Sequence, residues 1–333
     1  MNDTTIFAER PAHVPATTPA ATTSGMLRAP LYIAWQITNE CNLNCLHCIE
    51  ESGPGKAFPD ELSDDQVFGV LRQIVEDEVP YVSFSGGEPM LHPRFFDMVK
   101  YACEGGVELK VETNGHYLTP EACARLKEYG VKAVQVSLDG ATPETFQRMR
   151  VRGDFQKTLD GLGNLQAAGV PIEINYSPTS FSAHEVGPAV DLAARFGAAS
   201  FYTGRTMYTG NAVRTWKKMT PTDEQYELLF ATLYEKAAEY EGRMRVHFHE
   251  MGLLEELRYR LDNPAALFIV LPNGLVKLIN ALPFVCGDLR TQSLGSVWKH
   301  FQEAWQDPRV AQFVQELADN PGSTSSLHKW VFV

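Results

Sequence analysis

Short apolar runs alternate with amphipathic stretches along most of the chain. From about residue 27, each apolar run of strand length is followed by a stretch with helical periodicity, which is typical of βα units around a largely parallel sheet. Ser63 before two aspartates and Thr119 before Pro120 are characteristic helix N-caps. Six such units can be counted, with strands predicted at 31–37, 81–84, 107–111, 133–137, 172–176 and 200–202.

The pattern changes after Thr220. Long charged stretches predict helices over 221–240 and 250–261. They are followed by the apolar stretch ALFIVLPNGLVKLI, whose central Asn273 and Gly274 favour a β-hairpin. The last third of the chain is therefore expected to form a helical and hairpin appendage.

A length of 333 residues suits two average domains or one large α/β barrel. Residues 1–26 are rich in Thr, Ala and Pro and have little to bury, so they are expected to form a flexible tail. We expect the remaining chain to divide into a core barrel over 27–220 and a C-terminal region over 221–333.

Composition excludes several classes of protein. Hydrophobic residues at 44% and charged residues at 21% are ordinary for a globular chain. A net charge of -12 would repel a phosphate backbone, so nucleic acid is not an expected partner. No run of 18 apolar residues suggests a membrane span, and residues 1–30 lack the pattern of a signal peptide. These features predict a cytoplasmic protein without a membrane partner.

Three cysteines follow the first predicted strand closely. Cys41, Cys45 and Cys48 form C-x3-C-x2-C in CNLNCLHC. Structural zinc sites usually take four ligands from paired C-x2-C elements, and no second such pair is present. A [4Fe–4S] cluster normally uses four thiolates, so three would leave one iron open to a small ligand. The spacing therefore favours an open iron–sulfur cluster over zinc.

A second motif, FSGGEP, follows the second predicted strand. Gly86 and Gly87 would let the backbone approach a ligand closely, and Glu88 could accept hydrogen bonds from an ammonium group. Alone, this stretch ending in Pro89 is a weak motif, and a tight turn before a helix is the alternative.

Taken together, these residues resemble the radical S-adenosylmethionine (radical SAM) superfamily, whose signature is this cysteine spacing after the first barrel strand. In that family the open iron chelates S-adenosylmethionine (SAM), which an electron from the cluster cleaves to methionine and a 5′-deoxyadenosyl radical that abstracts hydrogen from substrate. The resemblance implies that the GGEP element, Gly86 to Pro89, positions the methionyl amino group. It also implies that His47 packs near the adenine, although a packing histidine is an equal alternative.

The resemblance extends to the ends of later strands, where barrels keep their functional groups. It implies cofactor contacts for Asn114 in ETNG, for Ser137 and Asp139 in SLDG, and for Asn175 beside the ribose. Arg148 or Arg152 could bind the methionyl carboxylate, since guanidinium matches a carboxylate bidentately. Either arginine could equally be a solvated helix charge. The further residues considered are Arg205 toward substrate, Tyr202, Met207, Tyr208 and Trp216 at the substrate mouth or in loop packing, His247, His249 and Glu250 as a metal site, and Cys103 and Cys123 as buried thiols.

The C-terminal segment around Cys286 resembles that of maturase and cofactor-biosynthesis members related to the PQQ, haem d1 and molybdenum-cofactor enzymes. Those relatives often place auxiliary-cluster cysteines there. In this chain the corresponding position after the hairpin turn reads Lys277 to Asn280, and only Cys286 is present. No auxiliary cluster is therefore expected.

We accordingly predict an α/β fold, a partial (β/α)6 barrel resembling an incomplete TIM barrel with a C-terminal helical and hairpin appendage that covers the substrate. The resemblance implies a radical SAM enzyme with one [4Fe–4S] cluster, SAM, and an electron donor such as flavodoxin or ferredoxin. Its substrate is expected to be a peptide or a small-molecule cofactor precursor. A non-catalytic iron–sulfur protein for electron transfer or regulation, and a zinc-stabilised binding protein, are the alternatives.

Overall fold

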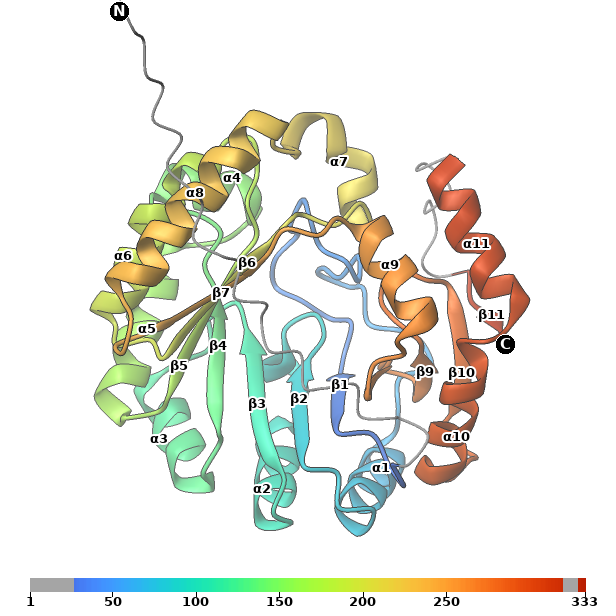
Figure 1. Ribbon diagram of the computed structural model, residues 1–333. Helices are drawn as coiled ribbons and strands as arrows, with labels where there is room; N and C mark the ends of the chain where they lie inside the picture. Colours follow the sequence, from blue (N-terminus) through green and yellow to red (C-terminus); the bar gives the residue numbers. More distant parts are fainter. Residues whose placement is uncertain (1–26, 320–328) are drawn as a thin grey trace, which may run out of the picture.

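One curved sheet organises the computed structural model, which describes residues 27–319 and 329–333. Seven of its strands run parallel and side by side in chain order (Figure 1). They are β1 (Tyr32–Gln36), β2 (Tyr81–Ser85), β3 (Glu108–Thr113), β4 (Ala133–Ser137), β5 (Ile172–Tyr176), β6 (Ser200–Gly204) and β7 (Arg245–His249). The first six match the six predicted strands, so the barrel fold is confirmed. The predicted flexible tail lies outside the described residues.

The chain after Thr220 adds strands to both edges of this sheet. β7 pairs in parallel with β6, whereas β8 (Leu267–Val270) pairs in parallel with β1. β9 (Leu275–Lys277) is antiparallel to β8 and forms the expected hairpin with it. β10 (Phe284–Asp288) and β11 (Val331–Phe332) complete the order beyond β9. Sequence analysis predicted the hairpin but not its pairing with β1.

Helices cover the outer side of the strands (Figure 1). Ser63 caps the first helix with a capping box, and Thr119 accepts a hydrogen bond from the Ala122 amide at the start of the third, as predicted. The helices are α1 (Asp64–Glu76), α2 (Phe95–Glu104), α3 (Pro120–Tyr129), α4 (Pro143–Met149), α5 (Phe155–Ala168), α6 (Val186–Arg195), α7 (Asn211–Met219), α8 (Asp223–Glu239), α9 (Leu253–Asp262), α10 (Leu294–Ala304) and α11 (Pro308–Asp319), with short 3₁₀ turns η2 (Pro89–Leu91) and η3 (Ala183–Glu185). The two helices predicted after Thr220 correspond to α8 and α9.

On β3 to β5, strand alternation gives the sheet an apolar outer face and a polar inner face. On β3, Leu109 and Val111 are buried against the helices, while Lys110 and Glu112 alternate with them toward the interior. The Lys110 Nζ lies 3.4 Å from Glu112 and 3.8 Å from Glu173 on β5. Closed TIM barrels fill this space with branched apolar side chains. Here the interior carries charges instead, as a binding space would.

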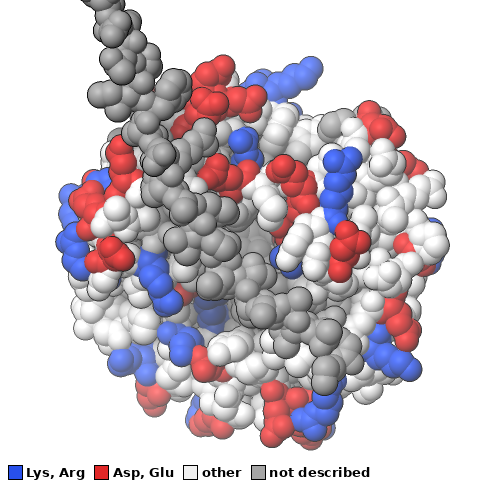
Figure 2. All heavy atoms as spheres, in the orientation of Figure 1, with Lys and Arg blue, Asp and Glu red and all other residues white. Residues whose placement is uncertain are grey.

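The surface mixes charges of both signs. On the face seen in Figure 2, acidic and basic side chains are interspersed. Among residues 27–319 and 329–333, no helix is both long enough and apolar enough to cross a bilayer.

Candidate active site

The cysteine loop begins just after β1, and its three thiols pack together. Each sulfur receives at least one N–H group: Leu43 N lies 3.4 Å from Cys41 Sγ, Ser52 N 3.3 Å from Cys48 Sγ and Arg150 Nη1 3.8 Å from Cys45 Sγ. The remaining cysteines, Cys103 in α2, Cys123 in α3 and Cys286 in β10, are free thiols distributed over other elements. The structure therefore brings together the three predicted ligands and no others.

This environment fits an iron–sulfur cluster. Burial raises the pKa of the Cys41 and Cys45 thiols to about 12, and a coordinated metal ion reverses this by deprotonating its thiol ligands. N–H donors to sulfur stabilise thiolates and tune clusters. In the part of the chain that the structure describes, no three His, Cys, Asp or Glu side chains are grouped closely enough to hold a single ion. Ligands of different irons in one cluster stand farther apart, so the spacing of the thiols is compatible with a cluster.

The GGEP segment is joined to the cysteine loop backbone to backbone. Gly87 N donates to Thr38 O at 2.8 Å, and Glu88 N donates to Glu40 O at 2.9 Å. A Cβ on Gly87 would lie 2.1 Å from the Glu40 oxygen. Gly86 has φ +134°, and its Cβ would lie 2.2 Å from the Thr38 oxygen. Only glycine permits this approach, which explains the paired glycines in physical terms.

Glu88 is fully buried and bonded to the protein itself. Its carboxylate accepts hydrogen bonds from Thr113 Oγ1 at 2.8 and 2.9 Å, from Asn114 N at 2.9 Å and from Met90 N at 3.2 Å. Burial raises the pKa of Glu88 to about 7, although these donors oppose the shift. Pro89 begins η2 directly afterwards. Glu88 thus anchors the GGEP loop to the end of β3, and its contact with an ammonium group stays a prediction.

Asn114 supports the cysteine loop from the end of β3. Its Nδ2 donates to Asn42 Oδ1 at 2.9 Å and lies 4.0 Å from Cys41 Sγ, while its Oδ1 accepts from His116 N at 3.0 Å. All the polar atoms of the Asn114 side chain are therefore occupied by the protein. The predicted contact of Asn114 with the cofactor is untested.

A buried charged cluster stands beside Cys45. Asp139, which is fully buried at the end of β4, lies 2.7 Å from Arg150 Nη2 and 3.3 Å from His47 Nε2. Its other oxygen accepts from Ser177 N at 2.8 Å. Burial lowers the pKa of His47 to about 4 despite the nearby carboxylate, so the imidazole is neutral. His47 and Asp139, predicted separately, are thus in one cluster.

Arg150 is the residue that sequence analysis missed. Burial lowers its pKa, but the Asp139 and Cys45 charges outweigh burial and leave that pKa above the ordinary value. The arginines considered instead are both exposed, with Arg148 lying over the Phe181 ring at 4.1 Å and Arg152 in the turn that follows. The available signal was helical periodicity, because Arg150 lies four residues after the fully buried Phe146.

Ser137 and Asn175 occupy the carboxyl ends of β4 and β5. They are directly paired in the sheet register, are half-buried, and share the inner face. Their position agrees with the prediction that both face the cofactor side, although no contact tests it.

Helix α7 is hydrogen-bonded to the cysteine loop, a contact that sequence analysis did not predict. A Cβ on Gly210, whose φ is +57°, would lie 2.3 Å from the Cys48 oxygen. The hydrogen bonds from α7 are Asn211 N to Cys48 O at 2.9 Å, Asn211 Nδ2 to Cys45 O at 3.1 Å and Thr215 Oγ1 to Leu46 O at 3.0 Å. Three carbonyls of the loop are therefore fixed by one helix.

The aromatic residues predicted at the mouth are divided between two places. Tyr208 packs edge-to-face on Trp216 at 4.9 Å, and Met207 beside them is 36% exposed. Tyr202 instead stacks on His247 at 4.8 Å across the β6–β7 pair. Loop packing accounts for the first pair, and the second lies on the inner strand face.

The histidines of β7 do not form the metal site considered for them. His247 and His249 are exposed, and no group that includes them and Glu250 could hold an ion among the described residues. Arg205 donates to the Glu250 carbonyl at 2.8 Å and lies 4.3 Å from the Tyr226 ring. Arg205 therefore joins the end of β6 to the C-terminal region.

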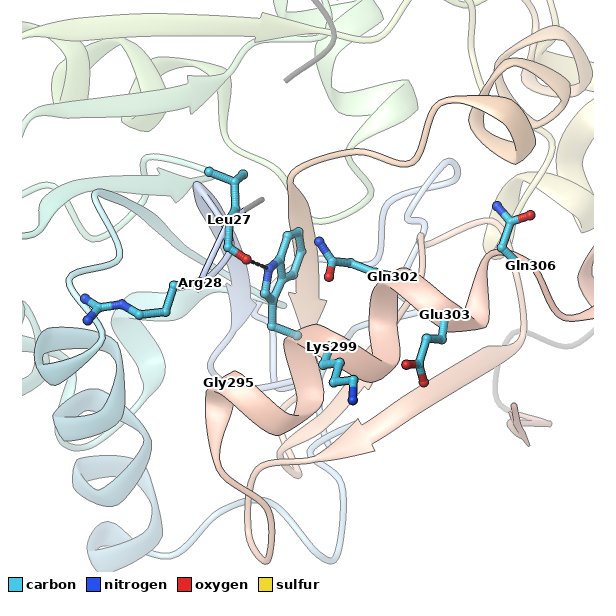
Figure 3. Close-up of a pocket in the computed structure, with 8 residues that line it drawn as sticks. Leu27, Arg28, Gly295, Lys299, Gln302, Glu303 and Gln306 are labelled. Carbon is cyan, nitrogen blue, oxygen red and sulfur yellow. Dashed lines mark hydrogen bonds between the residues drawn. The ribbon is translucent and has the colours of Figure 1, made fainter. Parts of the chain in front are cut away.

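A surface hollow of about 540 Å³ lies along α10, away from these residues. Trp298 Nε1 donates to the Leu27 carbonyl at 2.9 Å in this hollow. Figure 3 shows Leu27, Arg28, Lys299 and Glu303 among its lining residues. None of its lining residues comes from the cysteine loop or the GGEP segment.

Comparison with known proteins gives consistent matches. The family described as the radical SAM superfamily matches residues 35–179. Mycofactocin maturase MftC of Mycobacterium tuberculosis is 36% identical over 211 residues, which is 63% of this chain and 53% of MftC. The chain thus spans about half the length of the mycofactocin maturases that it matches. AdoMet-dependent heme synthase of Methanosarcina barkeri is 32% identical over 296 residues, covering 83% of this chain and 84% of that protein.

Solved structures share the fold. Streptococcus suis SuiB bound to S-adenosylmethionine superposes with a TM-score of 0.69 at 14% identity, over 88% of this chain and 69% of SuiB. Native anSMEcpe with bound AdoMet gives a TM-score of 0.62 at 17% identity, over 82% and 81% of the two chains.

Proposed function

The chain belongs to the radical SAM superfamily, and from that premise we propose that it binds one [4Fe–4S] cluster on Cys41, Cys45 and Cys48 and cleaves SAM reductively. The observation that carries this proposal is the set of three packed thiols, each with at least one N–H donor, on a loop joined by backbone hydrogen bonds to the GGEP segment. When bound, the cluster and SAM would supply the electron and the 5′-deoxyadenosyl radical for hydrogen abstraction.

The protein's own residues would bind the cofactors and orient them. Glu88 and its donors hold the GGEP backbone rigidly beside the cysteine loop. Asp139 holds Arg150 beside Cys45 and holds the neutral His47 near the same loop. Because these groups are buried and fixed before any ligand arrives, they lose little freedom on binding, which favours precise orientation of the cofactor.

The substrate is proposed to be a peptide or a cofactor precursor. Relatives of this chain include the sporulation killing factor maturation protein SkfB of Bacillus subtilis and the AdoMet-dependent heme synthases. SuiB has been solved bound to its precursor peptide SuiA. The polar inner face around Lys110, Glu112 and Glu173 would contact such a substrate. A flavodoxin or ferredoxin would donate the electron.

Anaerobic reconstitution tests this proposal. We expect a brown protein with about four irons that consumes SAM and releases 5′-deoxyadenosine when dithionite is added. Cys41→Ala, Cys45→Ala and Cys48→Ala should each lose the cluster, because a three-thiolate site has no spare ligand. Cys286→Ala is the matched control, since Cys286 is a buried free thiol in β10.

Two results would contradict the proposal. A stable cluster without consumption of SAM would favour the non-catalytic iron–sulfur protein. A large loss of iron in Cys286→Ala would reveal a second cluster.

A further inference from the structure

Lys277 is an unusually placed charge. It ends β9 and is 1% exposed, with Ile269 of β8 and Val285 of β10 as its direct strand partners. Those partners belong to an apolar cluster on the inner face of the sheet, packed against Ala34 of β1. The lysine therefore points from an apolar wall into the barrel interior, on the same face as Gln36, which lies two residues after Ala34.

The groups around Lys277 leave its ammonium incompletely bonded. Among the described residues its one hydrogen bond goes to the Asn280 carbonyl at 3.0 Å, although an ammonium has three donors. Glu50, two residues after Cys48, is the carboxylate whose charge acts on it, but the two form no direct ion pair. Burial lowers the pKa of Lys277, because its ammonium is poorly solvated in this position.

Two side-chain oxygens near Lys277 accept no hydrogen bond. Gln36 is 4% exposed, and its side chain donates to Asn280 Oδ1 at 3.5 Å and is hydrogen-bonded to Glu50, while its Oε1 has no partner. The Oε1 of Glu50 is likewise buried without a partner. Buried polar atoms are normally hydrogen-bonded, and each unsatisfied one costs about 1 to 3 kcal/mol. Two buried oxygens and an ammonium with one hydrogen bond therefore remain in this cluster, and a ligand with both donors and acceptors would satisfy them.

We propose that Gln36, Glu50, Lys277 and Asn280 form a recess that binds the main-chain end of an amino acid or peptide substrate. A substrate carboxylate would accept from Lys277, and a substrate amine or amide N–H would donate to Gln36 and Glu50. The main-chain end of an amino acid or peptide supplies a carboxylate beside an N–H donor. This assignment rests on the proposed function, because it is that reaction's substrate that the recess would hold.

The recess is distinct from the predicted SAM side of the mouth. The GGEP segment and the Asp139 cluster lie at the ends of β2 to β4, whereas the recess is formed at β1 and β9. β9 is separated from β1 by β8, on the side of β1 away from β2. A ligand in the recess would therefore approach the cysteine loop from the opposite side, as a second molecule must.

The experiment compares two probes on anaerobically reconstituted full-length protein. The dipeptide L-alanyl-L-alanine and its C-terminal amide are titrated separately and followed by saturation-transfer NMR. We expect the free carboxylate to bind more tightly than the amide. Lys277→Met should weaken binding of the free dipeptide roughly ten- to a hundred-fold and abolish this preference. Lys132→Met, which removes an exposed lysine paired with Glu108, should leave the affinity within about two-fold.

Three results would overturn the proposal: equal affinity for dipeptide and amide, unchanged binding in Lys277→Met, or equal losses in both lysine variants. If Lys277→Met does not fold, Gln36→Leu replaces it and should weaken both probes alike, since it removes an acceptor of N–H. Iron content and SAM cleavage are measured on the same wild-type sample. Dipeptide binding without SAM cleavage would refute the proposed function and leave the recess standing.

Discussion

The first six βα units and the chain after Thr220 build the same sheet in different ways. In the first part, the site residues lie in short motifs at strand ends, and backbone hydrogen bonds join one motif to the next, as from Gly87 to Thr38. The second part has no such motif, yet it supplies β7 at one edge and β8 to β11 at the other. It also supplies the apolar inner wall and Lys277. The residues of the proposed active site thus lie in short sequence motifs, whereas the walls that enclose the site depend on strand pairing between segments far apart in sequence.

Removing the second part should have the largest effect. A fragment ending at Thr220 would expose the β1 edge that pairs with β8 and the β6 edge that pairs with β7. It would also uncover the apolar surface that contacts α8 and α10, where Leu233 and Trp298 are buried. Exposed edges and large apolar patches promote aggregation. We expect residues 27–220 expressed alone to be much less soluble than the full chain expressed under the same conditions.

Solubility and size-exclusion chromatography check this expectation. A soluble, monomeric fragment that still bound a cluster would show that the first six units form an independent core, and would restore a strict division at residue 220.

Sequence analysis performed differently on the two parts for a physical reason. The six strands, the GGEP element and the cysteine loop were predictable because apolar runs, glycine pairs and cysteine spacing are local signals. The pairing of β8 with β1 was not, because the partners lie more than 200 residues apart and nothing in either strand encodes the other. Arg150 was missed because nothing in the sequence distinguishes it from Arg148 and Arg152, and its burial follows only from the fold.

The close approach between the GGEP segment and the cysteine loop can be tested with two glycine-to-alanine substitutions. Gly87→Ala would place a Cβ 2.1 Å from the Glu40 carbonyl oxygen, so the GGEP segment and the cysteine loop must separate. We expect destabilisation of about 2 to 4 kcal/mol and loss of cluster binding. Gly163→Ala in α5 is the control, because its Cβ meets nothing within 4 Å and alanine favours a helix by about 0.5 to 1 kcal/mol. Iron content and thermal unfolding measure both effects, and equal behaviour of the two variants would contradict this account.

The anchoring role of Glu88 predicts a smaller effect. Thr113→Val removes the hydroxyl that donates to both Glu88 oxygens and leaves only the two backbone donors. We expect the cluster to remain and SAM affinity to fall about three- to ten-fold, because the GGEP loop is held less firmly. Thr145→Val is the matched control, since it removes a Thr–Glu hydrogen bond to Glu185 outside the site. Anaerobic calorimetry should show weaker SAM binding only in Thr113→Val, and unchanged affinity there would make the bond purely structural.

The smallest predicted effect is a change in thermal stability, and it concerns Lys277 in the second part of the chain. Lys277→Met removes a charge buried in an apolar wall, and replacing such groups by apolar ones of similar volume is often stabilising. We expect the variant to unfold about 2 to 4 °C higher than the wild type at neutral pH, a difference of about 1 kcal/mol. Because burial lowers the folded pKa of Lys277 below 10.5, the unfolded chain binds the proton more tightly. The cost of the buried charge is therefore fully present below the folded pKa and is lost as the pH rises toward 10.5. Thermal unfolding of the reconstituted proteins at several pH values should show the difference in unfolding temperature between variant and wild type narrowing as the pH rises.

Lys132→Met, at an exposed lysine paired with Glu108, is the control and should show no such gain in unfolding temperature at neutral pH. A variant less stable than the wild type at neutral pH would mean that Lys277 is satisfied within the fold, and that its place in β9 serves stability instead of binding.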